Sequence, residues 1–159
     1  MHGRNVAHLD LKPANVFMLK DGSVKIGNFT SCCLTDGGIC DEYRGGTLLY
    51  SAPEILKRNR ITNKADIWSI GCIIHEICTL GWTWGESTNL AQIQENILHA
   101  DPKKLPREYS EFLTHAVNRM LAKKPEDRPS AKDLLNTLHL KDFQQFLLKN
   151  MISFNPEGE

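Results

Sequence analysis

Apolar and polar residues follow two different patterns along the chain, and the change falls near residue 63. Ahead of it, short apolar runs at 15–19 and 24–26 predict two strands, and the Asp-Gly pair at 21–22 between them is a strong hairpin signal. Residues 30–50 are rich in Gly, Thr, Asp and Cys and show no period. They predict a long irregular loop, and loops of that length are usually functional or disordered.

Beyond residue 63 the apolar spacing is helical. Asn63 is a candidate N-cap for a helix over 64–80, which is apolar on nearly all sides and is therefore expected in the middle of a core. Two amphipathic helices and a helix capped by Ser130 follow, and a last short helix and a fraying tail end the chain. These predicted segments are 89–98, 111–121, 130–138, 143–148 and 155–159.

The composition is that of one ordinary globular domain. The chain has 159 residues, of which 41% are hydrophobic and 24% are charged. Basic and acidic residues number 19 each, so the charge pattern excludes a basic footprint for nucleic acid or for an anionic membrane. The longest apolar stretch, 67–80, is too short and too polar to span a bilayer, and the N-terminus has no apolar signal-peptide core. We therefore expect a cytoplasmic protein.

Cysteines occur in an odd number, five. Without a visible signal peptide we expect free thiols in a reducing compartment. A zinc site at Cys32, Cys33 and Cys40 is the alternative, but it needs a fourth ligand and a better spacing. The remaining two cysteines, Cys72 and Cys78, lie within the predicted central helix.

The segment 8–15, with the sequence HLDLKPAN, carries a chemically specific set of residues. It resembles the catalytic loop of protein kinases, H-R-D-x-K-x-x-N, and its Lys-Pro pair resembles serine/threonine kinases. The resemblance implies that Asp10 is the base, that Lys12 neutralises the transferring phosphate, and that Asn15 holds a magnesium ion. It also implies ATP and Mg²⁺ as cofactors, and a structural role for His8.

Further motifs follow in the order that the kinase family shows. They resemble the end of the activation segment at 46–47, the A-P-E motif at 52–54, the start of the central helix at 66–71 and the late arginine loop at 125–129. The resemblance covers about residues 1–140, and segments such as LKPANVF look closest to the NIMA-related group. It implies structural roles for Thr47, for a buried Glu54–Arg128 ion pair, and for Asp66 as the holder of the catalytic-loop backbone.

The expected fold is mainly α: a protein-kinase-like C-terminal lobe with a small β-hairpin at the catalytic loop. The expected domain is an incomplete lobe over 1–149, followed by a flexible tail over 150–159. We expect the N-terminal lobe to be missing from this sequence, because only seven residues precede His8 and none forms a Gly-rich loop or a strand lysine. The helix that should pack on the central helix is missing with it, so we expect the chain alone to fold poorly or to be sticky.

Two substitutions depart from the family pattern. Asn28-Phe29-Thr30 stands where kinases have the metal-binding D-F-G motif. Asn15 and Asn28 are therefore the candidate metal and cofactor ligands, but a neutral amide at 28 lacks the charge that attracts a hard cation. Phe29 keeps a structural role. Leu9 stands where the family has an arginine that pairs with a phosphorylated activation loop, so this switch is expected not to operate.

Three hypotheses follow. The first is a catalytically impaired pseudokinase, or a fragment of one, that acts by binding a protein partner. The second is part of an ATP-dependent serine/threonine kinase whose N-terminal lobe lies outside this sequence. The third is the product of a decayed gene. The substrate and the identity of the partner cannot be inferred from the sequence.

Overall fold

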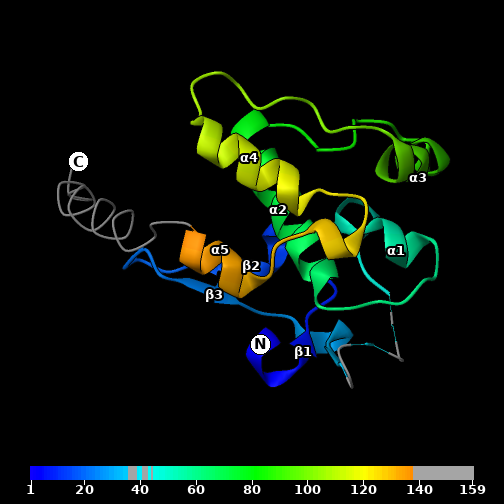
Figure 1. Ribbon diagram of the computed structural model, residues 1–159, viewed down its shortest axis with the longest axis vertical. Helices are drawn as coiled ribbons and strands as arrows, with labels where there is room; N and C mark the ends of the chain where they lie inside the picture. Colours follow the sequence, from blue (N-terminus) through cyan, green and yellow to red (C-terminus); the bar gives the residue numbers. More distant parts are fainter. Residues whose placement is uncertain (36–38, 41–42, 44, 138–159) are drawn as a thin grey trace. The chain divides into compact units, whose positions relative to one another are not determined.

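The computed structural model describes residues 1–35, 39–40, 43 and 45–137. The chain divides into two compact units, Met1–Pro129 and Ser130–Glu159. The first unit holds every candidate site residue named above, and its order of elements runs from short strands to helices (Figure 1).

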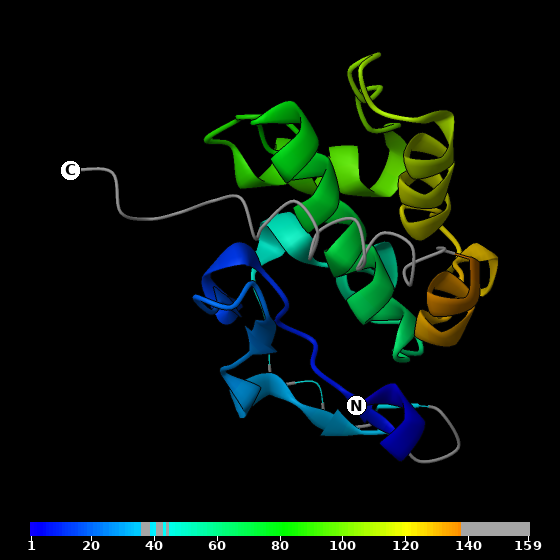
Figure 2. The same cartoon turned by 90° about the vertical axis from the view of Figure 1, so that its left-hand side faces the viewer.

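Short strands build the N-terminal part of the first unit. Strands β2 (Val16–Met18) and β3 (Val24–Ile26) pair antiparallel with Phe17 opposite Lys25, which confirms the predicted hairpin. Its turn contains Gly22 at φ 77°, a left-handed backbone that favours glycine. Figure 2 shows the short N-terminal strands below the helices of this unit.

Two further strands were not predicted. Strands β1 (Val6–Ala7) and β4 (Cys33–Leu34) pair antiparallel, with Ala7 opposite Cys33. A strand of two residues has no room for an alternating pattern, so only the contact between distant segments reveals it. The region predicted as one irregular loop therefore contains a strand. It also contains the 3₁₀ turns Phe29–Ser31 and Leu48–Tyr50.

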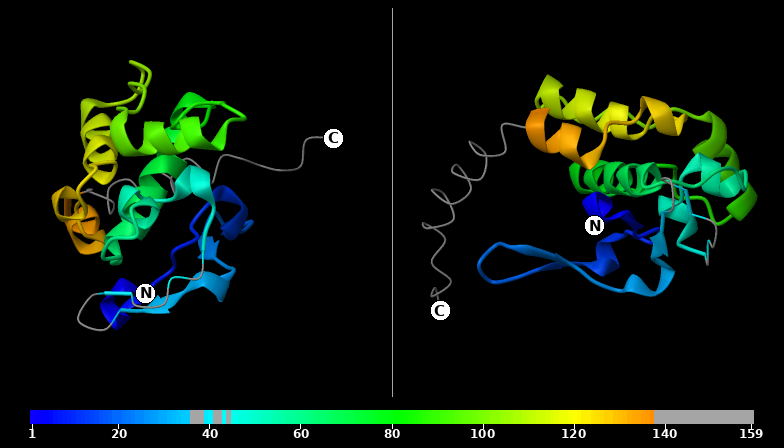
Figure 3. Two further views of the ribbon diagram at one scale, coloured as in Figure 1. Left: turned by 90° about the vertical axis from the view of Figure 1, so that its right-hand side faces the viewer. Right: turned by 60° about the horizontal axis from the view of Figure 1, so that its bottom comes forward.

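Helices make up the rest of the first unit. The predicted helices are confirmed to within about a residue at each end, as α2, α3 and α4. A short helix, α1, was not predicted, and a 3₁₀ turn follows α4. The bounds are α1 Pro53–Leu56, α2 Lys64–Thr79, α3 Leu90–His99, α4 Glu111–Met120 and the turn Pro125–Asp127. In Figure 3, α2 lies between α4 and the N-terminal strands.

Helix α2 is buried on one side and open on the other. Trp68 and Cys72 are buried, whereas Ile77 is 64% exposed and Leu80 is 92% exposed. The prediction of burial on nearly all sides was therefore wrong for the side of α2 that carries Ile77. The predicted cap needs a correction too, because the side chain of Asn63 makes no capping bond. The hydroxyl of Thr62 accepts the hydrogen bond from the Lys64 N–H instead, at 3.2 Å.

Helices α2 and α4 approach closely at Gly71. A Cβ added there would lie 2.9 Å from Met120 Cβ and 3.0 Å from Leu121 Cδ2. We expect Gly71→Ala to lower the free energy of unfolding by about 1–3 kcal/mol, because the two helices must separate. Urea unfolding followed by circular dichroism measures this. The matched control is Gly81→Ala, whose added Cβ would meet no atom closer than Glu86 Oε1 at 3.6 Å. Equal stability of the two variants would contradict the tight packing.

The cysteines differ from the prediction. Cys33 and Cys40 form a disulfide, whereas Cys32, Cys72 and Cys78 are free. The expectation of five free thiols was wrong for this pair, because the fold places the Cα atoms of Cys33 and Cys40, seven residues apart in the sequence, 5.8 Å from each other. Across the described residues, no three His, Cys, Asp or Glu side chains are grouped to hold a metal ion, so the zinc alternative has no support.

The second unit begins with helix α5 (Ala131–Thr137). Asp133 Oδ2 accepts from the Ser130 N–H at 2.8 Å and from the Ser130 hydroxyl at 2.6 Å, and Ser130 Oγ accepts from the Asp133 N–H at 3.1 Å. This reciprocal capping confirms the predicted helix start. The predicted helix 143–148, the tail 150–159 and the domain boundary at 149 lie outside the described residues.

None of the helices in the described part of the chain combines the length and the apolarity needed to cross a bilayer.

Candidate active site

Asp66 holds the segment 8–15 in place. This residue is 1% exposed and lies in the first turn of α2. Its two carboxylate oxygens accept hydrogen bonds from the backbone N–H groups of His8 and Leu9, both at 2.8 Å. Leu9 has a left-handed backbone, φ 64°, and its side chain is buried. Such a conformation is unfavourable for leucine, and the contacts with Asp66 stabilise it.

Two histidines complete this support. Nδ1 of His8 accepts from the Asp10 N–H at 3.3 Å, so the ring proton lies on Nε2, which donates to the Gly27 carbonyl at 3.0 Å. His2 Nε2 lies 2.8 Å from Asp66 Oδ2. The sequence reasoning missed His2 because this residue precedes the motif. The only signal for it was its place six residues before His8.

Asp10 is buried and fully engaged by its neighbours. Oδ1 accepts from the Thr47 N–H at 3.0 Å and from the Thr47 hydroxyl at 2.8 Å. Oδ2 pairs with Lys12 Nζ at 3.1 Å, and Lys12 also donates to the Thr47 hydroxyl at 2.7 Å. Partial burial raises the pKa of Asp10, but the hydrogen bonds from Thr47 and Lys12, with the charge of Lys12, outweigh it and lower the pKa below its ordinary value. Asp10 is therefore an ionised carboxylate at neutral pH.

Thr47 reaches Asp10 because the chain beside it passes very close to the catalytic loop. A Cβ added to Gly46 would lie 2.7 Å from the Leu9 carbonyl oxygen. Only glycine fits at this distance. The segment that ends at Thr47 is thus packed against the segment that carries Asp10.

Asn15 and Asn28 lie together, but they are bonded to each other. Asn15 Nδ2 donates to the Asp10 carbonyl at 2.7 Å and to Asp10 Oδ2 at 3.2 Å, which leaves Asn15 Oδ1 as its acceptor. Asn28 Nδ2 donates to that oxygen at 3.3 Å. Asn28 Oδ1 in turn accepts from the Thr30 hydroxyl at 2.8 Å. Both amide oxygens that were predicted to bind a metal ion therefore accept a hydrogen bond instead.

These residues do not fit a magnesium ion. Mg²⁺ binds through carboxylates and water in octahedral geometry. Asp10 supplies the sole carboxylate among the three residues of the cluster, and it is paired with Lys12. Thr30, at the glycine position of the motif, adds a hydroxyl that holds Asn28 in this arrangement. In the sequence Thr30 was identified only as the last residue of the segment that replaces D-F-G, and this hydrogen bond was not predicted.

The other residues with predicted structural roles are Phe29, Glu54 and Arg128. The ring of Phe29 lies 5.4 Å from the His8 ring and is 53% exposed. Glu54 and Arg128 form a bidentate ion pair with both N–O distances at 2.7 Å, and they are 4% and 1% exposed. Arg128 also donates to the carbonyls of Ala122 and Lys123, at 2.8 and 3.1 Å.

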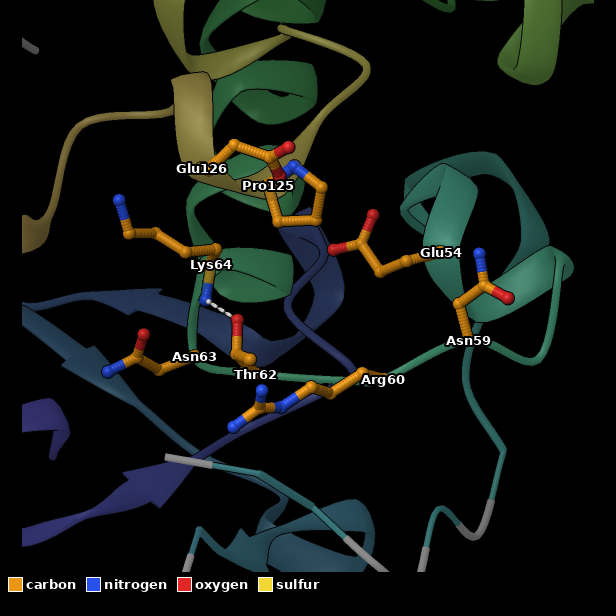
Figure 4. Close-up of a pocket in the computed structure, with 8 residues that line it drawn as sticks. All are labelled: Glu54, Asn59, Arg60, Thr62, Asn63, Lys64, Pro125 and Glu126. Carbon is orange, nitrogen blue, oxygen red and sulfur yellow. Dashed lines mark hydrogen bonds between the residues drawn. The ribbon is translucent and has the colours of Figure 1, made fainter. Parts of the chain in front are cut away.

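Next to this ion pair lies a cavity of about 530 Å³, between α1, the segment 59–64 and the turn Pro125–Asp127. In Figure 4 the Glu54 carboxylate points into the cavity, and Lys64 N donates to the Thr62 hydroxyl. None of the residues of the Asp10 cluster lines it. The cavity is therefore separate from the candidate active site.

The structure places Asp10, Lys12 and Asn15 in contact on one loop, and Asp66 holds the backbone of that loop. A family model, the protein kinase domain, matches residues 1–140. The chain belongs to the protein kinase family.

Several similar proteins are NIMA-related kinases. Serine/threonine-protein kinase Nek11 of Homo sapiens is 38% identical over 150 residues, and that of Mus musculus is 37% identical over 150 residues. Serine/threonine-protein kinase Nek1 of Mus musculus is 28% identical over 169 residues, which cover 99% of this chain and 14% of Nek1. The Nek11 matches cover 93% of this chain but 23% of those proteins. The chain thus spans about a quarter of the length of the Nek11 relatives.

Proposed function

We propose that the chain is the C-terminal lobe of a NIMA-related serine/threonine kinase with impaired catalysis, and that it acts by binding a protein partner. The observation that carries this is the hydrogen bond from Asn28 Nδ2 to Asn15 Oδ1, at 3.3 Å. It engages one of the two lone pairs of the oxygen through which a kinase asparagine binds magnesium. The lost charge at residue 28 and this competing hydrogen bond act in the same direction.

The residues that orient a substrate hydroxyl are nevertheless present. Asp10 is ionised and can accept a proton, and Lys12 lies beside it as a cation for a transferring phosphoryl group. What the site lacks is the positive charge that a metal ion supplies to the phosphates. The residues that would act on a substrate hydroxyl are therefore retained, whereas the metal ligands that would position the phosphates of ATP are not.

Exposed apolar side chains support a role in protein binding. Met18 is 78% exposed and Val24 57%, and the two are cross-strand partners on one face of the hairpin β2–β3. Phe17, 52% exposed, lies on the other face. Exposed apolar side chains that share a face mark interaction sites or aggregation-prone regions. Since a two-stranded hairpin is marginally stable alone, cover from a partner would stabilise it.

A second candidate is the C-terminal half of a working kinase, completed by an N-terminal lobe. The intact contacts among Asp10, Lys12 and Thr47 favour it. The two candidates differ in whether Asn28 permits metal-dependent binding of nucleotide.

Nucleotide-induced thermal stabilisation distinguishes them. We expect no Mg²⁺-dependent rise in the melting temperature with 1 mM ATP, even when the chain is completed with an N-terminal lobe, because the site offers no free anionic ligand pair. A true ligand at 100 times its Kd would add about 2.7 kcal/mol, which is readily detected. Asp10→Asn is the control, since it removes the remaining carboxylate. A Mg²⁺-dependent shift that Asp10→Asn abolishes would overturn the proposal of impaired metal binding.

A further inference from the structure

The cysteine pair Cys33–Cys40 joins two parts of the first unit. Cys33 lies in β4 opposite Ala7, the residue that precedes the catalytic loop. Cys40 forms an isolated antiparallel bridge with Ile61, and its N–H donates to the Ile61 carbonyl at 2.8 Å. Their Cα atoms are 5.8 Å apart. The disulfide therefore connects the strand beside the catalytic loop to the segment that leads into α2.

We propose that Cys33 and Cys40 form a peroxide-sensitive thiol–disulfide switch that fastens the chain between β4 and Ile61. This function is separate from phosphoryl transfer and does not depend on the proposed function above. It assigns the pair as a reversible modification site with a peroxide as oxidant and a dithiol as reductant.

Cys40 lies at a cavity that a small oxidant can enter. The cavity has a volume of about 710 Å³, and Arg58 and Arg60 also line it. Both arginines are exposed. Nearby cations lower the pKa of a thiol and so increase the fraction of reactive thiolate. Cys40 is itself only 6% exposed on the surface, so this cavity is its route to solvent.

The other two cysteines of the region, Cys33 and Cys32, differ in their roles. Cys33 is 8% exposed and is fixed by β-pairing within disulfide distance of Cys40, which suits the resolving thiol. Cys32 is adjacent and free. Burial and, to a smaller extent, the charge of Asp66 raise the pKa of Cys32, so its thiolate fraction is lower.

The chemistry balances in two steps. The Cys40 thiolate attacks one peroxide oxygen, the O–O bond breaks, and Cys40 sulfenic acid and hydroxide form. The Cys33 thiolate then attacks the sulfenic sulfur, the S–S bond forms, and hydroxide leaves and takes up a proton as water. Two thiols are oxidised by two electrons and one peroxide is reduced. A dithiol reverses the reaction by exchange through a mixed disulfide.

The switch acts on the backbone beside the catalytic loop. In the oxidised state, Cys40 is held by the disulfide and by its hydrogen bond to Ile61. Cys40 lies seven residues before Thr47, whose hydroxyl donates to Asp10. Reduction removes one of the two constraints at Cys40 and leaves the Ile61 hydrogen bond alone. The Cys40 amide should then exchange its hydrogen more rapidly.

The test uses the full chain, reduced and then exposed to hydrogen peroxide at neutral pH. Protease cleavage before Asp36 and Asp41 separates Cys40 from the peptide with Cys32 and Cys33, so only a disulfide keeps the two peptides linked. We expect a Cys33–Cys40 link that a dithiol reverses. In Cys33→Ser, dimedone should trap a sulfenic acid at Cys40. Linkage through Cys32, or no link at all, would overturn the proposal.

Two further measurements test its parts. Arg58→Ala with Arg60→Ala removes two cations that line the same cavity as Cys40 and should slow sulfenic acid formation by roughly threefold, since a lower thiolate fraction is partly offset by higher nucleophilicity. Arg107→Ala with Lys124→Ala, at exposed cations outside the cavity, should leave the rate unchanged. Equal rates in both pairs would overturn the role of the arginines.

The second measurement is hydrogen exchange of the Cys40 amide. Equal exchange rates in oxidised and reduced protein would overturn the proposal that the disulfide fastens the chain at Ile61.

Discussion

Replacing Asn28 by aspartate should create a divalent-cation site and, in a chain completed with an N-terminal lobe, raise phosphoryl transfer by on the order of 100-fold. The carboxylate adds a negative charge beside Asn15. It also has no N–H, so the hydrogen bond that Asn28 Nδ2 donates to Asn15 Oδ1 disappears and that oxygen becomes available. The Thr30 hydroxyl can still donate to residue 28, as it does now at 2.8 Å. Two oxygen ligands are gained by one substitution.

Metal binding is measured first, on the chain as it is. Titration with Mn²⁺, followed by water proton relaxation, should show at least tenfold tighter binding for Asn28→Asp, because the number of charged ligands sets the affinity of such sites. Asn28→Leu is the matched control, since it frees Asn15 Oδ1 and adds no charge. If Asn28→Asp binds no better than Asn28→Leu, the negative charge is not what the site lacks, and the account of Asn28 is wrong.

Loss of Arg128 should be among the most destabilising single changes in the chain. Arg128→Met is expected to lower the free energy of unfolding by about 3–5 kcal/mol, because it leaves the Glu54 carboxylate buried and unpaired. The pair is bidentate at 2.7 Å on both arms, and neither side chain is more than 4% exposed. With a total stability of about 5–15 kcal/mol for a typical domain, this variant approaches unfolding. The urea midpoint, followed by circular dichroism, measures the loss.

Two comparisons isolate the cause. Arg119→Met removes an exposed arginine whose Nε and Nη2 donate to the Asp127 carbonyl at 3.2 Å, and it should cost less than about 1 kcal/mol. Glu54→Leu combined with Arg128→Met should regain part of the lost stability, since no buried charge then remains. A double variant as unstable as Arg128→Met alone would show that packing of Arg128 over Trp68, 5.0 Å from the ring, carries the effect instead.

The helices and the hairpin could be predicted because their determinants are local. The 3.6-residue spacing of apolar residues sets α3 and α4, and the Asp-Gly turn sets the hairpin β2–β3. The pairing of β1 with β4 could not be predicted, because each strand has two residues and the register comes from contact between segments far apart in sequence. The open side of α2 follows from which segments pack on it, and residue spacing within the helix does not record that.

The site shows the same division. The motif placed Asp10, Lys12, Asn15 and Asn28 in one cluster, because the short catalytic loop and the hairpin bring them together by chain connectivity. The motif also identified the missing charge at residue 28. It could not show that the Asn28 amide donates to Asn15, or that Thr30 holds Asn28, because an amide side chain can donate or accept and its neighbours decide between the two.

The sequence by itself determined the family, the order of the helices and the loss of a carboxylate at residue 28, since each depends on residue type and local spacing. The tertiary structure decided the rest: the disulfide between Cys33 and Cys40, the strand pair beside the catalytic loop, and the direction of the hydrogen bonds around Asn15. These features depend on distances between segments that are separated along the chain, and such distances are set by packing of the whole unit.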